Sequence, residues 1–174
     1  MAPSNDEERR VQSYLQVQGA KLSPAELVAK VRVAMDELRI TAAAVPAARF
    51  YDPPAPGEWS ANEVLAHVAD AGALFAERVR RSLDGEPQEP EAGRREEPPP
   101  RRPPAEWLSL LERDREAFFD RVLRVNPAAH PEAVIAHPAF GPLTWRETVL
   151  FIRVHDLDHA RQLRKIAEAF GANE

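Results

Sequence analysis

Three short segments of this 174-residue chain have the pattern of a helix N-terminal capping box, and they constrain the fold more than any other feature. In each, a serine or threonine precedes a glutamate by three positions: Ser23 and Glu26, Ser60 and Glu63, Thr144 and Glu147. The hydroxyl accepts a hydrogen bond from the glutamate's backbone amide, while the glutamate carboxylate accepts one from the amide of the cap residue. The three segments therefore predict helices that begin just after residues 23, 60 and 144.

Apolar residues recur every three or four positions after each of these starts, as on the buried face of a helix. Pro103 and Pro104 predict a fourth helix from about residue 104, because proline suits the first helical turn. A short extra helix is a further prediction for Val11–Val17, and no segment shows a useful length of strand-type alternation. Four apolar stripes pack most simply as a four-helix bundle, so the predicted fold class is all-α.

Two long connections separate the predicted helices. Residues 86–103 are rich in proline and charge and offer almost nothing to bury, so we expect an extended loop. The second connection covers residues 126–143, and both are long enough to cross a bundle, so the topology stays open on these grounds. A domain linker is the alternative for 86–103, but neither pair of helices could close a core alone. We therefore expect an N-terminal extension over 1–22 and one domain over 23–171.

Composition narrows the class of function. The net charge is −5, which argues against a nucleic-acid partner, because duplex-binding proteins present a basic face. The absence of cysteine leaves histidine and carboxylate as the strong metal ligands. Residues 1–10 lack the apolar run of a signal peptide, and no segment approaches the length of a membrane-spanning helix. We expect a soluble, cytoplasmic protein with no membrane partner.

Three of the five histidines fall on apolar stripes of predicted helices. His155 and His159 lie four positions apart, between Ile152 and Leu163, and His67 lies three past Val64. A helix rises ~1.5 Å per residue. With level helix ends, His67 and the pair His155 and His159 are therefore offset along the helix axis by roughly 9 Å if their helices are parallel and by roughly 5 Å if they are antiparallel. Three inward imidazoles in an aliphatic core each need a polar partner, and a shared metal ion would satisfy all of them.

Two other interpretations compete with this one. A single inward histidine is more often a hydrogen-bonded core residue than a metal ligand. Alternatively, the segment HDLDH could be a variant of the zinc-protease motif HExxH, with Asp156 as the base. Aspartate is one methylene too short, however, and only fifteen residues follow His159 in which to find a third ligand. Asp156 and Asp158 are expected to be solvated surface charges as readily as parts of the site.

The segments PAPGEWSANEVLAHVADA and HPAFGPLTWRETVLFIRVHDLDHARQL resemble the DinB/YfiT-like superfamily of metalloenzymes. The likeness covers about residues 24–170. It implies a four-helix bundle in up-down-down-up order, in which the second and fourth helices are antiparallel. It also implies that His67, His155 and His159 are the metal ligands, since all three match the histidines of the family.

The resemblance implies chemistry as well. Members include transferases that use low-molecular-weight thiols, and three histidines without a fourth protein ligand describe an open, catalytic type of site. The free position would activate water or such a thiol for transfer to, or hydrolysis of, a small molecule. Zinc is the first expectation, with nickel, cobalt and iron as alternatives, because imidazole suits them all. A metal-binding bundle without turnover, with a binding or stress-response role, is the alternative function.

Residues near the ligands should orient the imidazoles. Gln162 lies three past His159, and Asp70 lies three past His67, so these two are the candidates.

Relatives in the superfamily commonly form homodimers, and the resemblance therefore implies a homodimer here. The sequence adds one hint, because Phe118 and Phe119 diverge by ~100° on their helix. One ring is then expected at the edge of the core, where it could seed an interface. A stripe wide enough to bury both rings is the alternative.

Overall fold

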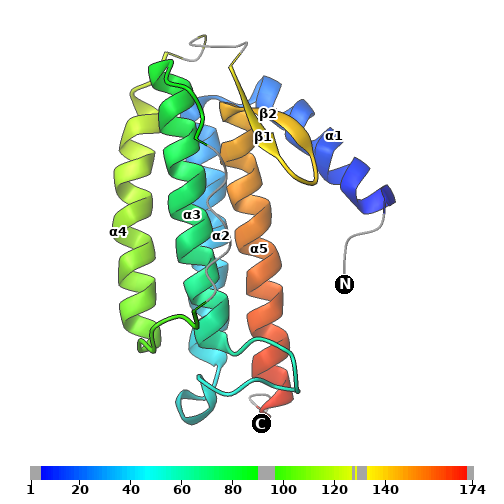
Figure 1. Ribbon diagram of the computed structural model, residues 1–174, viewed down its shortest axis with the longest axis vertical. Helices are drawn as coiled ribbons and strands as arrows, with labels where there is room; N and C mark the ends of the chain where they lie inside the picture. Colours follow the sequence, from blue (N-terminus) through cyan, green and yellow to red (C-terminus); the bar gives the residue numbers. More distant parts are fainter. Residues whose placement is uncertain (1–4, 90–96, 127, 129–132, 172–174) are drawn as a thin grey trace.

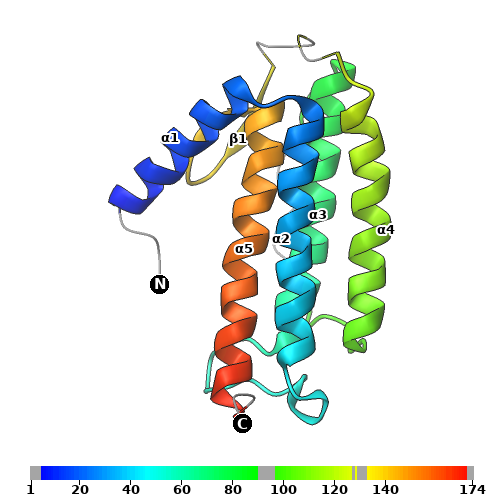
Figure 2. The same cartoon turned by 180° about the vertical axis from the view of Figure 1, so that it is seen from behind.

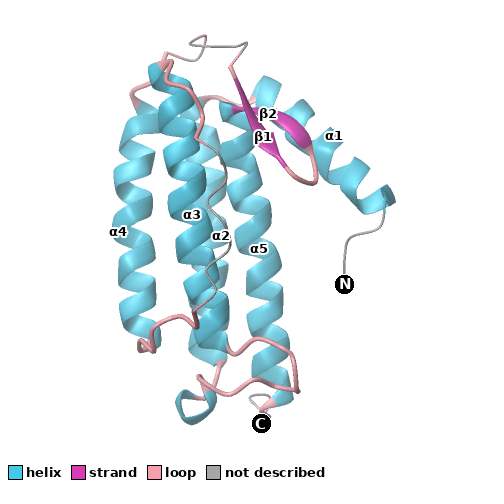
Figure 3. Cartoon of the chain, in the orientation of Figure 1, coloured by secondary structure: helices cyan, strands magenta, loops and turns pink. Residues whose placement is uncertain are grey.

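A computed structural model describes residues 5–89, 97–126, 128 and 133–171. The described chain is mostly helical (Figure 3). Its elements are α1 (Asn5–Lys21), α2 (Pro24–Ala44), the short 3-10 helix η1 (Ala47–Arg49), α3 (Ala61–Asp84), α4 (Pro104–Leu123), β1 (Val134–His137), β2 (Gly141–Thr144) and α5 (Trp145–Ala169).

The predicted helix starts are confirmed. Ser23, Ser60 and Thr144 are the N-caps of α2, α3 and α5, and each forms both halves of the capping box with its glutamate. Pro104 is the first residue of α4. The helix α3 ends at Gly85, whose φ of 69° is a left-handed conformation that glycine adopts without steric cost.

The four long helices α2, α3, α4 and α5 lie side by side (Figures 1 and 2). The colours of Figure 1 show α2 and α5 running downward and α3 and α4 running upward. The helix α2 packs against α4 and α5, and α3 packs against the same two helices. The two helices that carry the histidines, α3 and α5, are therefore antiparallel neighbours.

The core divides into two apolar clusters along the helices. The first cluster, next to the β-hairpin, includes Leu15, Val31, Phe119, Trp145 and Ile152. The second cluster, next to η1, includes Leu38, Phe50, Trp107, Leu163 and Ile166. In α5 the first cluster ends at Ile152 and the second begins at Ala160, so residues 153–159 lie between them. The histidine pair falls in this interval.

The connection over 126–143 contains a β-hairpin that the sequence analysis did not predict. The strands β1 and β2 are antiparallel, with Ile135 opposite Leu143, and both of these side chains are buried. Each strand has four residues and a single buried side chain at its centre. Four residues are too few for alternation to show in the sequence, so the signal was missing rather than misread.

The N-terminal helix is longer than predicted. It spans α1 rather than Val11–Val17 alone, and it packs against α5. Leu15 is fully buried in the first cluster, and the guanidinium of Arg146 donates hydrogen bonds to the carbonyl oxygens of Gly19 and Leu22. These contacts attach α1 to the start of α5.

The proline-rich connection between α3 and α4 is only partly described, because residues 90–96 lie outside the described residues. Its second half is anchored by Asn62, which is buried near the start of α3. The Asn62 amide donates to the carbonyl oxygen of Pro100, and its side-chain oxygen accepts from the backbone amide of Arg102. The connection, for which we expected an extended loop, is therefore held against the start of α3 at residues 100–102.

The prediction that one ring of the adjacent pair Phe118 and Phe119 lies at the edge of the core is wrong. Phe118 is 6% exposed and Phe119 is fully buried, both within the first cluster. The helix α4 packs against both α2 and α3, so its buried face is wide enough to include adjacent residues. The homodimer remains an expectation of the family resemblance that these two rings do not support.

Among the described residues, no helix is both long and apolar enough to cross a membrane.

Candidate metal centre

Three histidines from two helices meet between the apolar clusters. His67 lies on α3, and His155 and His159 lie one turn apart on α5. One ring nitrogen of each can be chosen so that all three lie within 4.8 Å of one another. The Nε2 atoms of His67 and His155 are 3.1 Å apart. Nitrogens bound ~2.0–2.1 Å from a tetrahedral zinc are separated by roughly 3.3 Å, so the spacing suits a divalent metal.

The antiparallel pairing of α3 and α5 produces this convergence. The centroid of the His67 ring is 5.1 Å from that of His155 and 4.8 Å from that of His159. All three side chains are partly buried, so each imidazole is shielded without being sealed off. The predicted convergence of the three histidines is confirmed.

Gln162 fixes the orientation of one of these imidazoles. Its side-chain oxygen Oε1 lies 2.9 Å from Nδ1 of His159. Because a carbonyl oxygen only accepts, Nδ1 carries the proton and donates it, which leaves the lone pair of Nε2 free for a metal. Asp70, the other residue suggested for this role, has an exposed side chain, and its participation stays a prediction.

The environment of His159 favours the neutral imidazole that metals bind. Burial lowers its pKa, and the nearby His155 lowers it further. The hydrogen bond with Gln162 and the charges of Asp158 and Asp156 act in the opposite direction, but the net shift is downward. A lowered pKa favours the neutral form of the His159 ring, with a proton on Nδ1 only.

The two aspartates between the histidines differ completely. Asp158 is exposed, as expected, and pairs loosely with Arg161. Asp156, however, is fully buried, so the interpretation of it as a surface charge is wrong. Its carboxylate binds Arg115 of α4 at 2.9 Å. Asp156 is therefore not placed as a protease-type base. Its carboxylate is bound to Arg115, and the group of side chains that could hold a metal ion consists of the three histidines without Asp156.

Sequence reasoning missed Arg115 although a signal was present. Arg115 lies four residues after Leu111 and three before Phe118, at a position where the apolar stripe of α4 calls for a buried residue. The side chain is 3% exposed in the structure. A charged residue in phase with an apolar stripe is the pattern that could have identified it.

Aromatic rings border the three histidines. The Trp59 ring lies 5.1 Å from the His67 ring and is stacked 6.4 Å from the His159 ring. On the other side, Phe75 and Phe151 approach His155, with centroids 5.9 Å and 6.0 Å away. These rings lower the local polarity and strengthen electrostatic interactions at the site.

His137 is not part of this group. His137 lies on β1, and its ring is 4.3 Å from that of Phe151, so the hairpin reaches the aromatic border of the site. His137 Nδ1 accepts hydrogen bonds from the backbone amides of Ala139 and Phe140, within its own turn. His130 lies outside the described residues.

A surface cavity of about 510 Å³ adjoins the site. Trp59 and Gln162 line it, and both also contact the histidines. Glu58 and Lys165 add one charge of each sign to its wall. The cavity is therefore a recess of mixed polarity that shares Trp59 and Gln162 with the surroundings of the imidazoles.

Comparison with models of known families matches residues 18–163 with the DinB superfamily. The matched region extends from the end of α1 into the last turns of α5, and all three clustered histidines lie inside it. Comparisons with curated proteins and with solved structures give no match.

Proposed function

Because the chain belongs to the DinB superfamily, we propose that His67, His155 and His159 bind a divalent metal ion, with zinc as the first candidate. The observation that carries the proposal is the set of donor atoms. One ring nitrogen from each of three partly buried imidazoles lies within 4.8 Å of the other two, and two helices hold these rings. Three neutral nitrogens leave a tetrahedral metal one open position. Nickel, cobalt and iron are the alternatives, since imidazole suits all three.

We infer that α2–α5 form the up-down-down-up bundle implied by the family resemblance, within one domain over residues 23–171. The helix directions in Figure 1 and the pairwise packing of the four helices support this assignment.

The reaction we propose is metal-dependent transfer or hydrolysis on a small molecule. A bound divalent ion would supply Lewis acidity, which lowers the pKa of a water or low-molecular-weight thiol at the open position. Gln162 holds the proton on Nδ1 of His159 and thereby directs Nε2 toward the ion. The recess beside Trp59 and Gln162 offers a place for the substrate, with Lys165 available to an acidic group and Glu58 to a basic one.

A metal-stabilised bundle without turnover is the second candidate. It is favoured by the aromatic border, because Trp59, Phe75 and Phe151 surround the histidines with apolar surface. The adjoining recess, lined in part by the polar side chains of Glu58, Gln162 and Lys165, favours the enzymatic function instead.

The metal assignment is tested by His155→Ala and His159→Ala, with His137→Ala as the matched control. We expect both ligand variants to lose most of the bound metal while keeping their helical content, because each truncation removes a donor from a partly exposed position. The control should keep its metal, since His137 hydrogen-bonds within its own turn. Elemental analysis of purified proteins and far-ultraviolet circular dichroism are the measurements. Full metal occupancy in both ligand variants would refute the site.

The choice between the two functions needs a separate experiment. The metal-loaded protein is incubated with low-molecular-weight thiols and electrophilic small molecules, and with hydrolysable esters and amides. Turnover that disappears in His159→Ala would support the enzyme. Metal binding without turnover of any compound would favour the binding protein.

A further inference from the structure

A buried ion pair lies in the interval between the two apolar clusters. The Nη2 atom of Arg115 donates to both carboxylate oxygens of Asp156, at 2.9 Å and 3.2 Å. The two side chains are 3% and 0% exposed. Removing two charges from water costs several kcal/mol per ion, and an apolar pair of similar volume is often as stable. Stability alone is therefore a weak reason for this pair.

The ion pair leads directly to the histidine cluster. Oδ1 of Asp156 lies 3.8 Å from Nδ1 of His155. The other nitrogen of the same ring, Nε2, lies 3.1 Å from Nε2 of His67. The Nε2 atom of His155 thus lies among the nitrogens that could bind a metal, and its Nδ1 atom lies beside a buried carboxylate.

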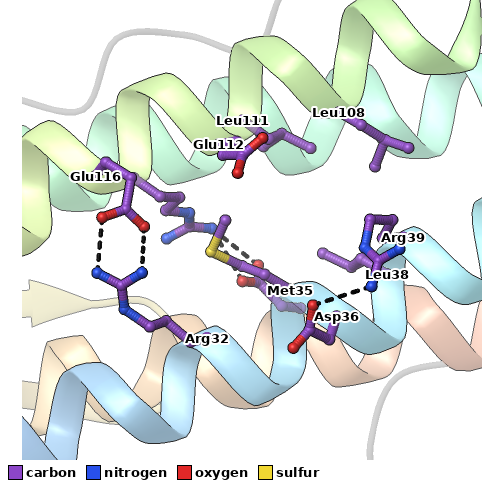
Figure 4. A pocket seen from close by; sticks show the side chains of 11 residues that line it. Arg32, Met35, Asp36, Leu38, Arg39, Leu108, Leu111, Glu112 and Glu116 are labelled. Carbon is purple, nitrogen blue, oxygen red and sulfur yellow. Dashed lines mark hydrogen bonds and ion pairs between the residues drawn. The ribbon is translucent and has the colours of Figure 1, made fainter.

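The helices α3, α4 and α5 build this arrangement, and α5 carries Asp156 and His155. On α3, Gly72 makes room for the guanidinium, because a Cβ at that position would lie 3.0 Å from Nη2 of Arg115. On α4, Arg115 has no partner for Nε or Nη1 among the described residues. A cavity of about 220 Å³ between α2 and α4 is lined by both members of the pair and by residues such as Met35 and Glu112 (Figure 4). This volume can admit water to the remaining N–H groups.

Two ion pairs lie at the rim of this cavity. Arg32 binds Glu116 through two hydrogen bonds, and Arg39 lies 3.4 Å from Asp36 (Figure 4). Arg32 and Arg39 bind these other carboxylates. Arg115 of α4 is the arginine that donates hydrogen bonds to Asp156.

From this geometry we propose that Asp156 is a positioning residue: its carboxylate accepts a hydrogen bond from Nδ1–H of His155 and directs Nε2 toward the metal, while Arg115 holds the carboxylate in place. The inference rests on the proposed metal site. It gives each ligand of α5 an oxygen beside Nδ1, since Oε1 of Gln162 lies 2.9 Å from Nδ1 of His159. The 3.8 Å separation of Oδ1 and Nδ1 is longer than a hydrogen bond, so the proposal requires the His155 ring to turn toward the carboxylate when a metal binds.

The experiment compares zinc dissociation constants, measured by competition with a chromophoric chelator. Asp156→Asn is expected to weaken zinc binding roughly 10–100-fold, the usual effect of losing such a partner. Asp158→Asn, the exposed aspartate beside the other ligand, is the matched control and should change the constant less than twofold. An unchanged constant in Asp156→Asn would overturn the proposal.

The double variant Arg115→Leu with Asp156→Leu separates positioning from folding. It leaves no buried charge without a partner, so it should fold as well as the wild type. Positioning predicts the same 10–100-fold loss of zinc affinity in this variant. A wild-type constant in the folded double variant would show that the pair is structural only.

The tautomer of His155 gives a readout that needs no metal. Nitrogen-15 NMR of the metal-free wild type should show the proton on Nδ1, and the double variant should shift toward protonation at Nε2. An unchanged tautomer would contradict the proposal. Failure of the wild type to bind any divalent metal would instead contradict the proposed function, so the two failures are distinguishable.

Discussion

Individual polar residues decide the chemistry of this bundle by occupying buried or partly buried positions among apolar side chains. His155 and Asp156 are adjacent in sequence, yet one contributes to the histidine cluster and the other is buried against Arg115 of α4. Each residue is tolerated because it has a polar neighbour, since a buried polar group without a partner costs free energy. The polar groups in the middle of the bundle are therefore single residues on its helices and do not form a separate sequence motif.

At the same scale, Phe119 is a core residue. We predict that Phe119→Ala lowers the free energy of unfolding by ~3–5 kcal/mol, because truncation of a fully buried ring leaves a cavity. Urea denaturation followed by circular dichroism measures the change. Leu123→Ala on the same helix is the control, since Leu123 is 46% exposed and its truncation should cost far less. Equal effects of the two substitutions would show that Phe119 is not buried in solution.

At the scale of elements, Asn62 joins three parts of the chain. It lies in the first turn of α3, binds the loop at Pro100 and Arg102, and accepts a hydrogen bond from Nε1 of Trp107 on α4 at 3.0 Å. One amide side chain thus satisfies three groups that lie 38, 40 and 45 positions further along the chain. The return of the long loop to the start of α4 depends on it.

We predict that Asn62→Ala destabilises the protein by about 1–3 kcal/mol, because the buried indole N–H loses its acceptor. Chemical denaturation gives the free energy of unfolding. The control is Asn126→Ala, since the Asn126 side chain is exposed and accepts only a local hydrogen bond from the amide of Ala128. A loss no larger than that of the control would mean that the loop is not anchored at this residue.

At the scale of the whole molecule, a metal would connect α3 to α5. His67 comes from one helix and His155 and His159 from its antiparallel neighbour, so binding would require the tertiary structure to be formed. A ligand that binds only the folded state raises stability by mass action.

We predict that zinc raises the Tm of the wild type. At a free concentration 100-fold above the Kd, the gain is about 2.7 kcal/mol, which corresponds to roughly 5–10 °C for a chain of this size. Differential scanning calorimetry with and without zinc, then with a chelator, measures the shift. His67→Ala should show little or no rise, because only the two ligands of α5 remain. The same rise in this variant would place zinc elsewhere.

The sequence by itself determined the helix starts, the family and the three clustered histidines. Each of these follows from local geometry: a capping box occupies four residues, and an i,i+4 pair lies on one helical turn whatever surrounds it. The antiparallel order of α3 and α5, which the family resemblance implied, then brought His67 to the pair.

Tertiary structure alone decided which side chains outside the stripes were buried. The helix α5 is packed by α1, α2 and α3, so its buried face is wider than one stripe and includes Asp156. The helix α4 is covered from two sides and buries Phe118 and Phe119 together. The width of a buried face depends on how many neighbours cover a helix, and a pattern along one helix does not contain that number.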